Sequence, residues 1–94
     1  MPKRVSNSTV RIGLIQTSCS LDPAANLKKT IDAAEHAARD GAQIICTQEL
    51  FRSQYFCQTE DHQFFKLAEP VPGPTTEAFQ KLAKRRKIVV IASI

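Results

Sequence analysis

Three short apolar runs, separated by segments of helical pattern, constrain the fold of this chain most strongly. They span residues 10–16, 42–47 and 88–94, and each contains at least two isoleucines. Runs of this kind are typical of strands that are covered on both faces of a parallel sheet. Their alternation with helices predicts an α/β fold with parallel strands.

The segment between the first two runs predicts a helix. Asp22 is a suitable N-cap, and Pro23 stands at the first helical position, where its missing N–H costs nothing. One apolar stripe at helical spacing follows, made of Leu27, Ile31, Ala34 and Ala38. Glu35 and Arg39 lie four residues apart on the other side, where we expect them to pair. Gly41 predicts the end of the helix.

The long segment between residues 49 and 74 predicts a short helix and an extended connection. Thr59 is the expected cap, with Glu60 and Asp61 in the first turn. The side chains expected to be buried are Phe64, Phe65 and Ala68. Three prolines around one glycine, at positions 70, 72 and 74, then predict an extended connection.

A further helix follows the prolines and carries the chain's densest basic cluster. Its inward side chains are expected to be Phe79, Leu82 and Ala83. The cluster comprises Lys81, Lys84, Arg85, Arg86 and Lys87. The net charge of +4 and the pI of about 9.2 suggest a nucleic-acid module. Cations at a helix C-terminus suit its dipole, however, and no aromatic stacking series accompanies them, so we predict no nucleic-acid binding.

Size and composition describe one globular unit. Of the 94 residues, 43% are hydrophobic, which suffices for a small core. We assign residues 1–9 to a polar N-terminal tail and residues 10–94 to the N-terminal part of a larger domain, truncated at its C-terminus within the run 88–94. Because no run approaches the roughly 20 apolar residues of a membrane span and no secretory signal is visible, we expect a cytoplasmic protein without membrane contact.

The three cysteines, Cys19, Cys46 and Cys57, form no Cys-x-x-Cys pair and no zinc pattern. Reduced thiols and no metal site are the prediction. A local nucleophilic pair, in which Cys46 or Cys57 works with His36 or His62, is an alternative. Cys46 belongs to an apolar run, which favours a core position instead.

Glu49 is the candidate catalytic residue because it stands just past the run 42–47. In open α/β sheets, reactive groups collect beyond the carboxyl ends of the strands. The competing interpretation is a surface carboxylate that caps a turn or pairs with a neighbouring base.

The residues around Glu49 carry a family resemblance. The run Gln48-Glu49-Leu50-Phe51, with its continuation to residue 58, resembles the nitrilase or carbon–nitrogen hydrolase family. The opening strand 12–16 and the segments 67–70 and 72–75 extend the likeness, which covers the chain from about residue 10 to residue 94. The resemblance implies that residues 10–94 are the N-terminal part of an α-β-β-α sandwich.

The resemblance also implies a chemistry. The family hydrolyses carbon–nitrogen bonds with a Glu, a Lys and a Cys, of which only Glu49 would lie in this chain, as the base. The lysine and the cysteine would follow beyond Ile94, so the 94 residues are expected to be inactive by themselves. A small-molecule carbamoyl amine or amide would be the substrate, with no cofactor and no metal, and the full-length protein would be a homo-oligomer.

Two residues are candidates for contacting an ammonium group on such a substrate, namely Tyr55 and Glu60. The alternative to an enzyme is a non-catalytic fragment or an interaction module.

Overall fold

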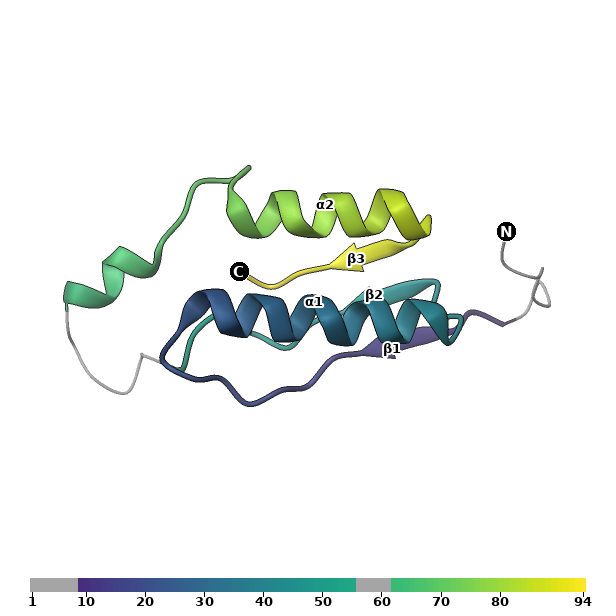
Figure 1. Ribbon diagram of the computed structural model, residues 1–94, viewed down its shortest axis with the longest axis horizontal. Coiled ribbons are helices and arrows are strands. Elements are labelled where there is room, and N and C mark those ends of the chain that lie inside the picture. The colour runs from purple at the N-terminus through teal and green to yellow at the C-terminus, as the bar shows by residue number, and fades with distance from the viewer. Residues whose placement is uncertain (1–8, 56–61) are drawn as a thin grey trace.

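The computed structural model describes residues 9–55 and 62–94 (Figure 1). The elements follow one another as β1 (Ile12–Leu14), α1 (Pro23–Arg39), β2 (Ile44–Cys46), the 3-10 helix η1 (His62–Leu67), α2 (Pro74–Arg86) and β3 (Val89–Ile91). This order confirms the predicted alternation of strands and helices. Most of the predicted N-terminal tail, Cys57 and the expected cap Thr59 with Glu60 and Asp61 lie outside the described residues.

The three strands form one parallel sheet in the order β1-β2-β3. Ile12, Ile44 and Val89 are aligned across it, as are Leu14, Cys46 and Ile91. Each strand is shorter than its apolar run, although backbone hydrogen bonds such as Gln43 to Arg11 at 2.8 Å extend the pairing. Because β2 is the central strand, Glu49, which follows it in the sequence, lies beyond the middle of the sheet.

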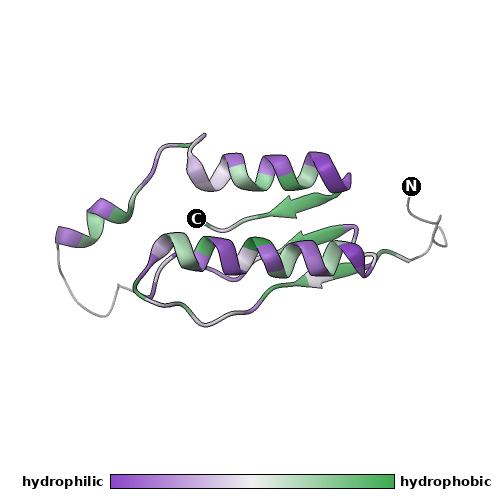
Figure 2. Ribbon diagram, viewed as in Figure 1, coloured by the Kyte–Doolittle hydropathy of each residue, from purple (hydrophilic) through white to green (hydrophobic). Residues whose placement is uncertain are grey.

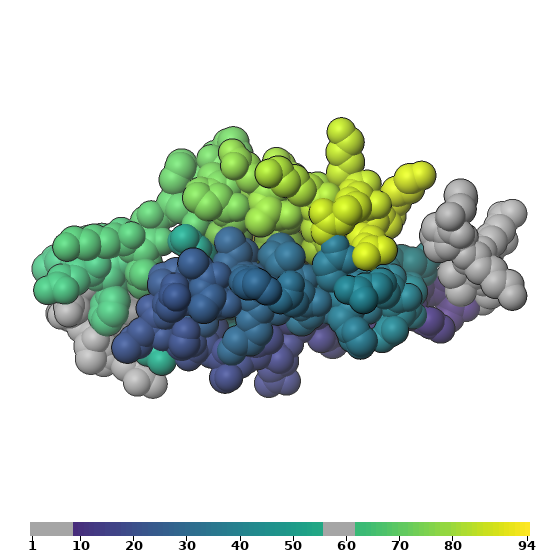
Figure 3. Space-filling view, viewed as in Figure 1, coloured from purple at the N-terminus to yellow at the C-terminus, as the bar shows by residue number. Residues whose placement is uncertain are grey.

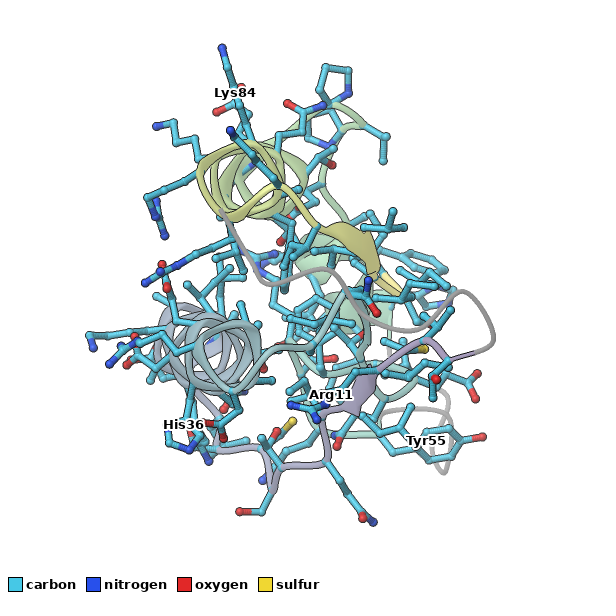
Figure 4. The ribbon with its side chains drawn as sticks, turned by 90° about the vertical axis from the view of Figure 1, so that its right-hand side faces the viewer. Arg11, His36, Tyr55 and Lys84 are labelled. Atoms are coloured by element: carbon cyan, nitrogen blue, oxygen red, sulfur yellow. The ribbon has the colours of Figure 1, made fainter. Side chains whose placement is uncertain are left out.

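Both long helices cover the same face of the sheet. Figure 4 shows α1 and α2 on one side of the strands, and the space-filling view shows them packed side by side (Figure 3). Between the helices and the sheet lies a small core, whose buried hydrophobic members are Ile15, Ala34, Ala42, Ile45, Phe51, Phe79 and Leu82. Phe79 and Leu82 were predicted to be buried, and Ala34 belongs to the predicted stripe.

The other face of the sheet is open within the described residues. Ile12 and Leu14 are 57% and 78% exposed, and Val89 and Ile91 are 57% and 55% exposed. The strands are apolar along their length (Figure 2). The expectation that helices or strands cover both faces is therefore not met in this part of the chain, because α1 and α2 pack on the same side. The two helices and the sheet correspond to one α layer and one β layer of the predicted sandwich.

Helix α1 begins and ends where the sequence predicts. The Asp22 carboxylate accepts hydrogen bonds from the backbone N–H groups of Ala24 and Ala25, at 3.0 and 3.4 Å. Gly41, just after the helix, has φ +100°, a conformation that side chains rarely adopt. Local capping explains why these boundaries were predictable.

Glu35 corrects the predicted pairing on α1. Its carboxylate binds the guanidinium groups of Arg85, in a short contact, and Arg86, at 2.7 Å, rather than Arg39. The reason is tertiary: α2 lies beside α1 and presents two cations to a carboxylate that is only 15% exposed. The hydrogen bond to Arg85 and, to a smaller extent, the one to Arg86 hold the pKa of Glu35 below its ordinary value.

The connection to α2 differs from expectation in its burial. Phe64 is half-buried, but Phe65 is 75% exposed and Ala68 is also exposed, so the predicted burial is wrong for two of the three side chains. The segment forms a single short 3-10 helix at the end of the molecule, where few neighbours are available to cover it (Figure 1). Gly73 then passes so close to the Pro70 carbonyl oxygen that a Cβ would lie 2.2 Å from it. Only glycine fits there.

Candidate functional site

The carboxyl ends of the three strands meet around residues 47 and 48. Ile15 donates its N–H to the Cys46 carbonyl oxygen at 2.9 Å, and Thr47 donates to the Ile91 carbonyl oxygen at 3.0 Å. These are the last regular bonds of the two parallel ladders. Beyond them, the side chains of Thr47 and Gln48, the two residues after β2, accept the next hydrogen bonds.

The Thr47 side chain continues the ladder toward β3. In a regular parallel ladder the N–H of Ser93 would donate to the Thr47 carbonyl oxygen, because Thr47 already bonds to Ile91. It donates instead to the Thr47 hydroxyl oxygen, at 3.0 Å. Thr47 is buried, with 7% exposure, so this bond is shielded from water.

The Gln48 side chain does the same toward β1. The N–H of Thr17 would regularly meet the Gln48 carbonyl oxygen, but it donates to Gln48 Oε1 at 2.7 Å. Gln48 Nε2 lies 3.9 Å from Cys19 Sγ, and that thiol donates to the Phe51 carbonyl oxygen at 3.1 Å. Two side-chain oxygens thus replace two carbonyl oxygens, and the backbone of β2 is free to leave the sheet.

Glu49 stands in the turn that follows. Leu50 has φ +54°, a left-handed conformation that is uncommon for a side chain of this size, so the direction of the chain changes there. Phe51 is fully buried and packs edge-on against Phe79, with ring centroids 5.5 Å apart. The Glu49 side chain is exposed, and within residues 9–55 and 62–94 it makes no hydrogen bond or ion pair.

Polar contacts also anchor the segment after the turn. Asn26, buried in α1 with 1% exposure, donates to the Arg52 carbonyl oxygen at 3.0 Å and to the Ser20 carbonyl oxygen at 2.8 Å. Arg52 pairs with Glu69 at 2.6 Å. Glu69 in turn accepts from the backbone N–H and the hydroxyl of Thr75, in the first turn of α2. Glu49 therefore sits on a turn that is fixed on both sides.

A cavity of about 450 Å³ lies beside this turn, between η1 and the ends of the strands. Its apolar wall includes Leu50, Phe64, Phe65, Val71 and Ile94, and its polar side includes Arg52 and Glu69. Glu49 is not among its described lining residues. The cavity therefore reaches the residue after Glu49, Leu50, but it does not enclose the Glu49 carboxylate.

Other candidate residues are not brought together. The Cys46 thiol donates to the Thr47 carbonyl oxygen at 3.5 Å, while His36 faces Asp40 at 3.4 Å and His62 packs edge-on against Phe65. Neither imidazole pairs with the Cys46 thiol, so the local nucleophilic pair is not formed between described residues. Cys19 and Cys46 are free thiols, as predicted, whereas Cys57 lies outside the described residues.

The two candidates for contacting an ammonium group have different outcomes. Tyr55 is 62% exposed and lies on the side of the sheet away from the helices (Figure 4). Glu60 lies outside the described residues. Among the residues that the structure describes, no three His, Cys, Asp or Glu side chains are grouped as metal ligands, and no helix is long and apolar enough to cross a membrane.

Several residues that shape this region were not singled out from the sequence. The burial of Asn26 was not predictable, because an amide near the start of a helix is more often exposed. Gln48, Arg52 and Glu69 lie in the segments that carry the family resemblance, but no pattern predicts their contacts, because their partners lie far along the chain; Gln48 and Thr17 are 31 residues apart.

A parallel sheet covered by helices defines an α/β protein, a class in which reactive groups usually lie beyond the carboxyl ends of the strands. The chain belongs to the carbon–nitrogen hydrolase family, whose sequence profile matches residues 11–94. It is therefore related to hydrolases that act on carbon–nitrogen bonds, which confirms the resemblance seen in the sequence.

Individual relatives agree with this assignment. The chain is 37% identical over 89 residues to N-carbamoylputrescine amidase of rice, and 35% identical over 96 residues to β-ureidopropionase of Arabidopsis thaliana. These alignments cover 94% and 90% of the chain but 30% and 23% of the relatives. A crystal structure of a carbon–nitrogen hydrolase from Helicobacter pylori superposes with a TM-score of 0.81 at 28% identity, over 90% of this chain and 30% of that one. The chain thus spans about 30% or less of the length of these proteins.

Proposed function

We propose that these residues form the base-bearing part of an amidase, with Glu49 as the catalytic base. The observation that carries the proposal is the place of Glu49, directly after the central parallel strand and on a turn anchored to both neighbouring strands. A base has to meet its reacting partner in a defined geometry, and an anchored turn supplies one. Family membership supports the same role.

In the proposed mechanism Glu49 takes up a proton twice and gives it back twice. It takes the proton of a cysteine thiol as the sulfur attacks the carbonyl carbon, and it returns that proton to the departing ammonia. It then takes a proton from the water that hydrolyses the thioester-like intermediate, and it returns that proton to the sulfur as the carbon–sulfur bond breaks, which restores the thiol and the carboxylate. A lysine stabilises the oxyanion. The lysine and the cysteine would follow Ile94 in a protein of the relatives' length.

The proposed substrate is N-carbamoylputrescine, which with water yields putrescine, ammonia and carbon dioxide, a step of polyamine biosynthesis. The support is the repeated similarity to plant enzymes of that name, at 36–39% identity. We further propose that the full-length protein is a cytoplasmic homo-oligomer. A second candidate is another amidase of the family, such as a β-ureidopropionase or an ω-amidase.

The test requires a protein of the relatives' length that contains residues 1–94. Glu49→Gln should abolish turnover of N-carbamoylputrescine and leave the circular dichroism spectrum and the melting temperature unchanged. Glu77→Gln, at an exposed position on α2, is the matched control and should keep full activity. Near-normal turnover by Glu49→Gln would refute the catalytic role.

Substrate class is tested separately with the parent protein. N-carbamoylputrescine, β-ureidopropionate and simple amides should be compared by their kcat/KM values. A preference for β-ureidopropionate or for a simple amide would overturn the proposed substrate but leave the role of Glu49 intact.

A further inference from the structure

We infer that Gln48 is the positioning residue of Glu49, an inference that rests on the function proposed above. The argument starts from the end of β2. A strand that kept its regular ladder through residue 48 would hold its backbone in the sheet plane. The carbonyl oxygens of Thr47 and Gln48 would then accept hydrogen bonds from the neighbouring strands. Residue 49 would then continue as strand, and its side chain would follow the alternation of the sheet.

The Gln48 amide removes this constraint without separating the segments. Its Oε1 accepts the Thr17 N–H at 2.7 Å, the bond that the Gln48 carbonyl oxygen would otherwise receive. The hydroxyl of Thr47 substitutes in the same way for Ser93, at 3.0 Å. The backbone can therefore turn at Leu50, with φ +54°, while residue 48 stays attached to β1.

The far end of the amide strengthens the attachment. Gln48 Nε2 lies 3.9 Å from Cys19 Sγ, and Cys19 donates to the Phe51 carbonyl oxygen at 3.1 Å. Glu49 is thus bracketed by contacts to the segment between β1 and α1, one before it and one after it. Within residues 9–55 and 62–94 the contacts that flank Glu49 are therefore those of Gln48 with Thr17 and of the Phe51 carbonyl oxygen with Cys19.

The chain offers a closely matched control at the other end of β2. Gln43 Oε1 accepts the backbone N–H of Arg11 at 3.0 Å, across a sequence separation of 32 residues. Gln48 makes the same kind of bond to the same neighbouring segment across 31 residues. The Gln43 bond is exposed and the Gln48 bond is part-buried, so a purely structural role predicts a difference in melting temperature between the two variants. A positioning role predicts in addition that kcat falls only for the glutamine next to Glu49.

The experiment compares Gln48→Met with Gln43→Met in a protein of the relatives' length, using N-carbamoylputrescine. Methionine keeps the length of the side chain and removes the amide. Gln48→Met should lower kcat by about 10- to 100-fold, since a displacement of about 1 Å can have that effect, with KM changed by less than about threefold. Gln43→Met should keep kcat within about twofold of the parent.

The melting temperatures of both variants show whether a fall in kcat comes from unfolding of the protein or from displacement of Glu49 in a folded protein. If Gln48→Met does not fold, Thr47→Val replaces it, because it removes only the hydroxyl that receives Ser93, and the same fall in kcat is expected. Equal kcat values for the Gln48 and Gln43 variants would overturn this inference while an inactive Glu49→Gln variant still supported the proposed function. Turnover by the Glu49→Gln variant, or no turnover by the unsubstituted protein, would overturn both this inference and the proposed function.

Discussion

Arg52 and Glu69 form an ion pair of 2.6 Å that joins the segment after Glu49 to the start of α2. Their side chains are 28% and 12% exposed, so the pair is largely shielded from water. Glu69 also receives both polar hydrogens of Thr75, although the N-cap residue Gly73 has no side chain to offer. One carboxylate therefore serves as ion-pair partner and as helix cap.

Replacing Glu69 by glutamine should destabilise the fold by about 1–3 kcal/mol, because a shielded cation loses its partner and the cap is weakened. Urea denaturation followed by circular dichroism measures the change. Asp32→Asn is the control, since the Asp32–Lys28 pair is highly exposed and should contribute little to stability. Equal losses for the two variants would contradict the role assigned to Glu69.

The Glu35 contact between the helices should make stability depend on pH. Its hydrogen bonds to Arg85 and Arg86 lower the pKa of Glu35 in the folded state from the ordinary value of 4.5. The folded chain then binds the proton less readily than the unfolded chain. The stabilisation is therefore fully present above pH 4.5 and is lost as the pH falls through the folded-state pKa.

The comparison of parent and Glu35→Gln at several pH values tests this dependence. The parent should melt at a higher temperature at pH 7, and the difference should shrink steadily below pH 4.5. A difference that stays constant down to pH 2 would show that the charge of Glu35 is not responsible.

Two phenylalanines provide a test of the core beneath the turn. Phe51 is fully buried against Phe79, whereas Phe65 is 75% exposed. Phe51→Ala should cost about 3–5 kcal/mol of unfolding free energy, and Phe65→Ala should cost less than about 0.5 kcal/mol. Chemical denaturation of both variants makes the comparison. A large loss for Phe65→Ala would mean that the cavity wall is more tightly packed than its exposure indicates.

The open face of the sheet should promote association of the 94-residue chain. Contiguous apolar surface of this kind favours contacts between molecules. We expect sedimentation velocity to show oligomers whose proportion rises with concentration, and the double variant Leu14→Thr/Ile91→Thr to reduce it. Leu21→Thr is the control, because Leu21 is 86% exposed but lies outside the sheet. An unchanged distribution for the double variant would rule out this face as the contact surface.

Local patterns predicted much of the fold. The Asp22–Pro23 start of α1, the parallel strands and the burial of Phe79 and Leu82 agree with the structure. The predicted partner of Glu35 and the burial of Phe65 do not. The first group is indicated by patterns within a short stretch of sequence, such as a cap or the period of apolar residues, while the second depends on which distant element lies alongside.

The sequence by itself determined the alternation of strands and helices, the placement of Glu49 after the second strand and the family resemblance. The first two depend on hydrogen-bonding and burial preferences that a short window of sequence contains, whereas the resemblance depends on residues spread from about position 10 to position 94. The tertiary structure decided that Gln48 meets Thr17, that Arg52 meets Glu69 and that both helices cover one face. Those contacts join residues far apart in the chain, so their geometry exists only once the sheet has assembled.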